Sequence, residues 1–284
     1  MNVFTITAKD KEDFKVFFSQ DTYEYIGKSG YFTMAATDDE DFVAGVLQFY
    51  IGEDFTEGIT AKITYLLVDE EFRGNGIGTL LINAFKDTIS ESKIEIATVE
   101  IFEDAGQELI KLFEESGFTR QGEVSYYCMP LLNLCKKAAI KTAVTGHCNS
   151  VSELTGSDKA SFFNSINPSI LKHGFKDYDL EVSSYYQEGE GKCLLLIRED
   201  EESVLETGFI YASAGSEKNL ISLLSYSAGK AKELYGPGCT LQITCRKPME
   251  YDLITKVAPE ISSDKYFLYS YKLPEVFISE DGIS

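Results

Sequence analysis

Histidine is scarce in this sequence, and its scarcity limits the chemistry that the chain can carry. Only His147 and His173 occur among the 284 residues, on segments with no evident relation. A zinc site needs several ligands at close spacing, and a histidine-activated nucleophile needs an equally tight constellation. Cys148 follows His147 directly, but neighbours in sequence seldom point their side chains at each other. The sequence therefore predicts no metal site and no Cys–His catalysis.

Paired cysteine motifs are missing as well. The chain has six cysteines and no CxxC pair. The first stretch, MNVFTITAKDKEDF, lacks the basic start and apolar run of a secretory signal. In a chain of this length without an export signal, the cysteines are predicted to be ordinary buried thiols.

Long apolar runs do not occur either. No stretch approaches the ~20 consecutive apolar residues that a helix needs to cross a bilayer. Together with the missing secretory signal, this absence predicts a soluble, cytoplasmic protein with no membrane partner.

Basic residues are outnumbered. The chain has 26 Lys and Arg against 46 Asp and Glu, which gives a formal net charge of −20. Such a surface repels phosphate backbones and anionic lipid, so neither nucleic acid nor membrane is expected as a partner. The simplest interpretation of the charge is solubility; the alternative is a negative cleft that attracts a cationic amine.

What is present predicts an α+β fold, a mixed sheet with helices. Hydrophobic residues make up 44% of the chain, enough for a large core. Strand patterns and helical spacings follow one another in the first half, with strands and helices alternating only in its middle. The predicted strands are GYFTMAAT, DFVAGVLQFYIG, AKITYLLV (Ala61–Val68), KIEIATVEIF and EVSYYCMPL. The predicted helices are DFKVFFSQ, the segment in which Ile77, Leu80, Leu81, Ala84 and Phe85 recur at helical spacing, and GQELIKLFEESGF with Gly117 as its C-cap.

The second half repeats this order after the segment NLCKKAAIKTAVTGHCNS. This segment has neither a strand nor a helix pattern and is predicted to connect two domains. The segment that begins at Gly208 aligns without a gap on the segment that begins at Tyr65, and a strand, a helix and a final strand follow in both. The sequence therefore predicts two copies of one unit, in domains 1–135 and 136–284.

The stretch EEFRGNGIGTLL places Gly74, Gly76 and Gly78 where a helix is about to begin. Glycine costs roughly 1 kcal/mol against alanine in a helix. A loop into a helix start exposes unpaired N–H groups at the positive end of the helix dipole, and missing Cβ atoms let a phosphate reach them. Arg73 adds a guanidinium suited to phosphate oxygens. The stretch is therefore predicted to bind a pyrophosphate.

Three kinds of phosphate-binding loop are alternative interpretations of this stretch. A P-loop needs Lys followed by Ser or Thr after its last glycine, and GIGTLL has no lysine. A dinucleotide fingerprint needs a glycine where Thr79 stands. The third kind fits, because Arg73–Gly78 resembles the R/Q-x-x-G-x-G/A signature of the GNAT superfamily of acyl-CoA-dependent N-acyltransferases. LLVDEEFRGNGIGTLL and LIKLFEESGF resemble that family's strand–loop–helix segment and its later helix.

The resemblance implies tandem GNAT-like domains and acetyl-CoA as the acyl donor. The acceptor would be a primary amine, either of a small molecule or of a peptide N-terminus, that attacks the thioester directly. The coenzyme A site would consist of Leu67 and Val68, which pair with the pantetheine arm, and of Arg73, Gly74, Asn75, Gly76, Ile77, Gly78 and Thr79, which hold the pyrophosphate.

The catalytic positions depart from the family pattern. The family's usual tyrosine in the later helix is replaced by Phe113, which cannot donate a proton, and its usual Asn near the start of that helix is also missing. The candidates that remain are Glu100 as base, and Tyr127 or its neighbour Tyr126 as acid. Alternatively, these side chains are structural, and catalysis rests on positioning and ordered water.

The second copy has lost the glycine signature, since Ser216, Asn219 and Ile221 align with Arg73, Gly76 and Gly78. It is therefore predicted to bind no coenzyme and to pack against the first copy as an intramolecular pseudo-dimer, with a homo-oligomer possible. Two other interpretations stay open: a non-catalytic acyl-CoA-binding or regulatory module, and a purely structural scaffold.

Overall fold

The computed structural model describes residues 1–40, 42–54, 58–90, 92, 94, 96–166, 175, 178–201 and 203–273. These residues form two compact units. The first contains Met1–Gly122 and the described residues after Tyr266, and the second contains Glu123–Tyr266. Among the described residues, no helix is long and apolar enough to span a membrane.

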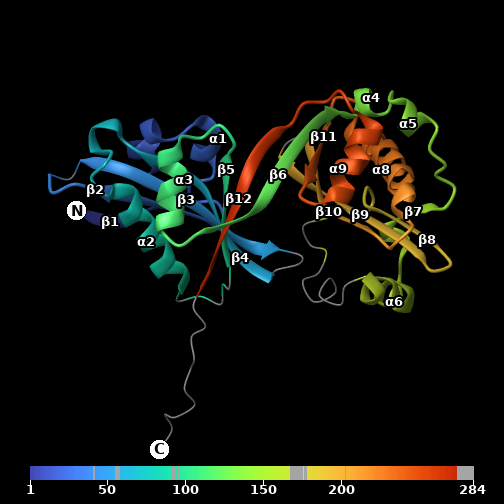
Figure 1. Ribbon diagram of the computed structural model, residues 1–284, viewed down its shortest axis with the longest axis horizontal. Coiled ribbons are helices and arrows are strands. Elements are labelled where there is room, and N and C mark those ends of the chain that lie inside the picture. The colour runs from blue at the N-terminus through green and yellow to red at the C-terminus, as the bar shows by residue number, and fades with distance from the viewer. Residues whose placement is uncertain are drawn as a thin grey trace, which may run out of the picture. The chain divides into compact units, whose positions relative to one another are not determined.

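The first unit is built on a mixed sheet with the strand order β1-β2-β3-β4-β5-β12, followed by the start of β6 (Figure 1). Neighbouring strands from β1 to β4 are antiparallel, whereas β4 and β5 are parallel. The bounds are β1 (Asn2–Ile6), β2 (Tyr31–Thr37), β3 (Val43–Asp54), β4 (Gly58–Val68), β5 (Ile96–Phe102), β6 (Thr119–Pro130) and β12 (Asp264–Lys272).

Helices cover both faces of this sheet. One face packs against α2 and α3, because the apolar residues of α2 recur at helical spacing and are buried; Phe85 of α2 meets Phe49 of β3 with ring centroids 4.9 Å apart. The other face packs against η1 through Phe14, against α1 through Tyr23, and against Ile26 just after α1. The bounds are η1 (Lys11–Phe17, a 3-10 helix), α1 (Gln20–Glu24), η2 (Glu70–Phe72), α2 (Ile77–Ser90) and α3 (Gln107–Glu115).

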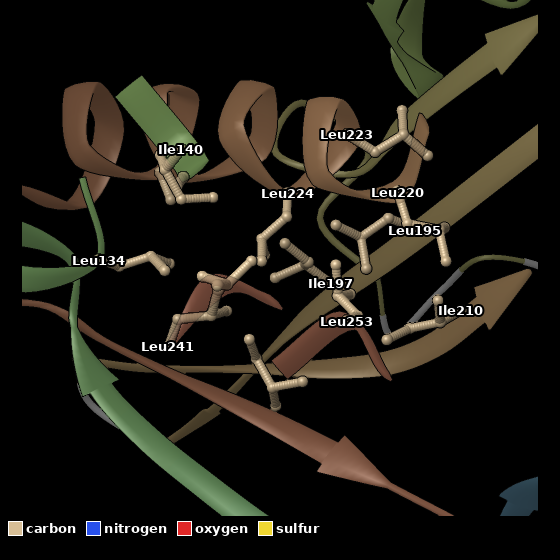
Figure 2. Close-up of a cluster of buried hydrophobic side chains, with 14 of the residues drawn as sticks. Leu134, Ile140, Leu195, Ile197, Ile210, Leu220, Leu223, Leu224, Leu241 and Leu253 are labelled. Atoms are coloured by element: carbon tan, nitrogen blue, oxygen red, sulfur yellow. The ribbon is translucent and has the colours of Figure 1, made fainter. Parts of the chain in front are cut away.

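The second unit has the strand order β7-β8-β9-β10-β11-β6. Its strands are antiparallel except for the parallel pair β10 and β11. Figure 2 shows side chains of α8 pointing toward Leu195 and Ile197 of β9. The bounds are α4 (Leu131–Leu134), α5 (Ala138–Lys141), β7 (Cys148–Ser150), η3 (Val151–Glu153), α6 (Gly156–Ile166), β8 (Ser184–Glu188), β9 (Gly191–Glu201), β10 (Val204–Ala212), η4 (Glu217–Asn219), α8 (Leu220–Tyr235), β11 (Thr240–Cys245) and α9 (Pro248–Val257).

The segment expected to connect two domains is folded into the second unit instead. It holds short helices α4 and α5, which place Leu134 and Ile140 in the buried cluster beneath α8 (Figure 2). Its apolar residues are too widely spaced to show a periodic pattern, so their burial could not be read from the sequence.

The two units share one order of elements: an antiparallel meander, a crossover helix, a parallel strand and a second helix. β4, α2, β5 and α3 in the first unit correspond to β10, α8, β11 and α9 in the second. This agreement supports the repeat that the sequence alignment predicts.

The predicted boundary at 135/136 would make β6 the final strand of the first sheet and β12 the final strand of the second. In the structure the two strands are exchanged. Strand β12 lies next to β5, with Tyr269 buried in the core of the first unit, and β6 pairs with β11 from Ser125 to Pro130. Strand pairing joins segments far apart in the chain, so a boundary drawn along the sequence cannot show it.

Candidate functional site

Strands β4 and β5 separate before they end. Their parallel register runs from Thr60 opposite Ile96 to Ile63 opposite Val99, and within the described residues it goes no further, although β4 continues to Val68. On its other side, β4 stays paired with β3 as far as Val68. The end of β4 therefore leaves one strand edge open, which we call the fork.

A bulge marks the residue at which the fork opens. In the register with β3, Gln48 lies opposite Tyr65 and Phe49 lies opposite Ile63, so Thr64 is the extra residue. A bulge bends its strand and increases the local twist. It therefore accounts for the divergence of β4 from β5 at this point.

The chain passes from the fork into a loop whose shape depends on glycine. Gly74 and Gly76 both have a φ of +78°, a left-handed conformation that other residues adopt at a cost. A Cβ atom on either residue would meet no atom within 4 Å. The space beside the loop is therefore open to a ligand.

The first turn of α2 directs backbone donors into this space. The first helical hydrogen bond joins the Leu80 N–H to the Gly76 carbonyl at 2.9 Å. The N–H groups of Ile77, Gly78 and Thr79 precede it and have no partner within the helix. Arg73 stands beside them, with its Nε donating to the Val68 carbonyl at 3.3 Å and its guanidinium 3.6 Å from the Glu70 carboxylate. Free amides at a helix start next to an arginine make an anion site.

The three glycines of the loop have different roles, which corrects the expectation that all of them make room for phosphate. A Cβ atom on Gly78 would lie 2.7 Å from Cδ2 of Leu112 in α3. Gly78 therefore allows close packing of two helices, whereas Gly74 and Gly76 shape the loop. Sequence spacing alone does not distinguish these roles.

Gly45 of β3 supports the fork and was missed from the sequence. A Cβ atom at this position would lie 2.8 Å from the Leu67 carbonyl oxygen and 3.1 Å from Ile77. Its absence lets the start of α2 settle onto the end of β4. In the sequence, Gly45 is only a glycine inside a predicted strand. Such a glycine is typical of a close approach between two backbones.

Glu100 lies on β5 just beyond the last paired residue, Val99, and forms an ion pair with Lys62 of β4. The Lys62 Nζ is 3.0 Å from the Glu100 carboxylate, and the side chains are 38% and 9% exposed, respectively. A carboxylate therefore stands at the base of the fork, held by a cation that the sequence analysis did not consider.

The candidate acids lie in the other unit. Tyr127 pairs with Ile243 of β11 and packs against the core of the second unit, and Tyr126 is in edge contact with Tyr266. Phe113, in the family's tyrosine position, is buried against Phe118 with ring centroids 5.3 Å apart. Neither unit by itself holds both Glu100 and Tyr127, and their catalytic roles stay predictions.

Cys148 is not an activated thiol. Burial raises its pKa to about 11, and the ring of His147 is in edge contact with that of Tyr186. His173 lies outside the described residues. The expectation of buried thiols holds for four cysteines, whereas Cys128 is exposed and Cys135 is half-buried.

In the second unit, the loop before η4 corresponds to the glycine loop, and its backbone N–H groups have partners within the loop itself. Gly215 has a φ of +82°, but its N–H donates to the Glu217 carboxylate at 3.2 Å, so an internal anion occupies the loop. Ser216 is buried and hydrogen-bonded to Ser213. A cleft of about 400 Å³ between α8 and α9 is lined by two carboxylates, Glu217 and Asp252, and by one cation, Lys256, so the charge of its lining is net negative and does not favour a pyrophosphate.

Comparisons with known proteins agree with this geometry. Residues 3–118 match the model of the acetyltransferase (GNAT) family. None of the curated protein sequences that were compared is significantly similar to the chain. Solved structures, however, match nearly the whole chain.

A tandem GNAT protein from the clavulanic acid biosynthesis pathway is 11% identical, with a TM-score of 0.56 over 95% of this chain and 98% of that one. A GCN5-related N-acetyltransferase from Sphaerobacter thermophilus is 12% identical, with a TM-score of 0.56 over 93% and 85%. A glucosamine N-acetyltransferase region in a fungal multi-domain β-N-acetylglucosaminidase is 12% identical, with a TM-score of 0.66 over 95% and 38%. At this identity the likeness shows the fold, and the predicted fold of two tandem GNAT-like domains is confirmed.

Proposed function

We propose, because residues 3–118 match the model of the acetyltransferase (GNAT) family, that the first unit transfers an acetyl group from acetyl-CoA to a primary amine. The pyrophosphate of the coenzyme would lie on the amides from Gly74 to Thr79, beside Arg73. The pantetheine arm would pair with the open edge of β4 at Leu67 and Val68.

The observation that carries this proposal is the combination of an open strand edge and an open amide loop in one unit. The edge offers hydrogen-bonding groups to an extended arm, and the loop offers donors to a diphosphate at the end of that arm. The second unit has a similar strand and helix, yet its loop is occupied by Glu217. Coenzyme binding is therefore assigned to the first unit alone.

The chemistry follows from the groups at the fork. The acceptor must attack as a neutral amine and lose a proton, and Glu100, which is paired with Lys62 at the base of the fork, would take that proton. A backbone amide of β4 near Val68 would stabilise the oxyanion of the tetrahedral intermediate, a contribution worth about 3 kcal/mol in acyl transfer. Attack forms the carbon–nitrogen bond, and collapse of the tetrahedral intermediate then breaks the carbon–sulfur bond and releases the thiolate of coenzyme A.

A thiol-release assay with acetyl-CoA and a panel of primary amines tests this function. An amine-dependent release of coenzyme A, with the acetylated amine identified by mass spectrometry, is the expected result. Tight binding of acetyl-CoA without transfer to any amine would instead favour a non-catalytic acyl-CoA-binding module. The replacement of the family's usual tyrosine by Phe113 is consistent with that alternative.

A further inference from the structure

Three tyrosines form a continuous row on the face of the first unit opposite α2 and α3. Tyr25 stacks on Tyr31 with ring centroids 4.3 Å apart, and Tyr31 meets Tyr50 at 4.8 Å. Tyr31 lies opposite Tyr50, and Tyr50 lies opposite Lys62. The side chains of Tyr31, Tyr50 and Lys62 therefore project from the same face of the sheet. The row therefore leads across β2 and β3 to β4.

Two glycines make room for the ring of Tyr50. A Cβ atom on Gly30 would lie 2.6 Å from the Tyr50 ring, and one on Gly52 would lie 2.3 Å from it. The ring consequently lies along the strand, and Tyr50 remains 38% exposed. An aromatic face held flat and partly open to solvent is a suitable surface for a ligand cation.

The row ends at Lys62 of β4, two residues before the bulge at which the fork opens. Lys62 stands directly opposite Tyr50, and its ammonium lies 3.0 Å from Glu100. Tyr50 is level with Lys62 and Thr98, and Glu100 lies two residues further along β5. Two strand spacings across the sheet and two residues along it separate the backbone of Tyr50 from that of Glu100 by about 12 Å. An aromatic face and a carboxylate thus stand on one surface at a fixed separation.

This surface already binds ammonium groups of the chain itself. The Nζ atom of Lys28 lies 4.5 Å from the ring centroid of Tyr25, and Lys62 is held by Glu100. The chain as a whole carries a formal net charge of −20, which attracts cations from a distance. Both the local and the long-range electrostatics therefore favour a cationic ligand.

We propose that the acceptor carries two amino groups about 12 Å apart, one acetylated beside Glu100 and the other held as an ammonium on Tyr50. This inference rests on the proposed function. The two ends of the surface would treat the two amines differently. Lys62 offsets the charge of Glu100, so the pair does not hold the nearer amine, which must be neutral to attack, in its charged form, whereas the aromatic face favours the charged form of the distant one.

Diaminooctane and octylamine provide the test, because both offer one amine at the same chain length and only the first has a second cation. The unaltered protein is expected to acetylate diaminooctane with a kcat/KM about tenfold higher, the size of effect that a cation on an aromatic face gives. Tyr50→Leu should abolish this preference through the KM of the diamine alone, and Tyr50→Phe should retain most of it. Phe42→Leu, which changes an exposed aromatic residue just before the start of β3, should leave the preference unchanged.

The outcomes separate this inference from the proposed function. Equal kcat/KM values for the two amines in the unaltered protein would overturn the inference and leave the acetyltransferase assignment intact. A preference for the diamine that survives in Tyr50→Leu would likewise overturn it. Acetylation of no amine at all would overturn the proposed function, and this inference with it. The first comparison needs no variant, so it does not depend on whether Tyr50→Leu folds.

Discussion

Gly45 of β3 and Leu67 of β4 lie so close together that a Cβ atom on residue 45 would be 2.8 Å from the Leu67 carbonyl oxygen. The contact involves backbone, which cannot rotate away as a side chain can. It fixes the end of β4, beyond the bulge at Thr64 and close to the start of α2. The geometry of the candidate coenzyme site thus depends on a residue outside the glycine loop.

Gly45→Ala is expected to lower the free energy of unfolding by about 1–3 kcal/mol, the usual cost of overpacking, and to weaken coenzyme A binding by displacing β4. Urea denaturation and calorimetry measure the two effects. Gly229→Ala is the matched control, because its Cβ atom would meet nothing within 4 Å inside α8. That variant should gain up to about 1 kcal/mol from helix propensity. A loss of stability in the control comparable to that of Gly45→Ala would argue against the steric explanation.

Tyr269→Ala is expected to destabilise the first unit by about 3–5 kcal/mol, the range for removing a large buried aromatic side chain. Tyr269 of β12 is 2% exposed within the core formed by α2, α3 and β5. Urea denaturation of the full chain measures the change. Leu234→Ala serves as the control, since Leu234 is 59% exposed. If both substitutions had the same small effect, β12 would not belong to that core.

Glu100→Gln is expected to reduce kcat about 10²–10⁴-fold, the contribution of general base catalysis, while the affinity for acetyl-CoA stays unchanged. The amide keeps the shape of the carboxylate but does not accept a proton. Steady-state kinetics and calorimetry provide the two readouts. Glu103→Gln alters an exposed carboxylate in the turn after β5 and should have no effect. Full activity of Glu100→Gln would show that catalysis rests on positioning and water instead.

The thiols should react with a maleimide in the order of their exposure. Burial raises the pKa of Cys193 and of Cys245 to about 12, so almost no thiolate is present in the folded chain at pH 8. Cys128 is exposed and should react first. Mass spectrometry of the native chain should show the first label on Cys128, and its loss in Cys128→Ser. Raised pH should not label Cys193 or Cys245 until it approaches their raised pKa, whereas rapid labelling of either at pH 8 would contradict the burial.

Much of the first unit could be predicted from the sequence because its signals are local. The apolar strand Ala61–Val68, the glycines and the helical spacing after Ile77 follow one another in the chain, and the structure places β4, the loop and α2 in that order. The similarity of the two halves likewise predicted their common order of elements.

The remainder depends on contacts between distant segments. Neither the bulge at Thr64 nor the ion pair of Lys62 with Glu100 leaves a pattern in the sequence, because each depends on the register of neighbouring strands. The position of β12 beside β5 is also non-local. The close approach of Gly78 to Leu112 has the same origin, and a glycine alone does not reveal whether it serves a ligand or a neighbouring helix.

Titration of acetyl-CoA into the unaltered chain, Gly76→Val and Gly215→Val tests the central claim most directly. Gly76 and Gly215 both have a positive φ and open surroundings, so valine imposes a similar backbone strain in either loop. Calorimetry should show one coenzyme site in the unaltered chain and in Gly215→Val, and a loss of binding in Gly76→Val at an unchanged fold by circular dichroism. Binding that survives in Gly76→Val and disappears in Gly215→Val would contradict the assignment of coenzyme A to the first unit.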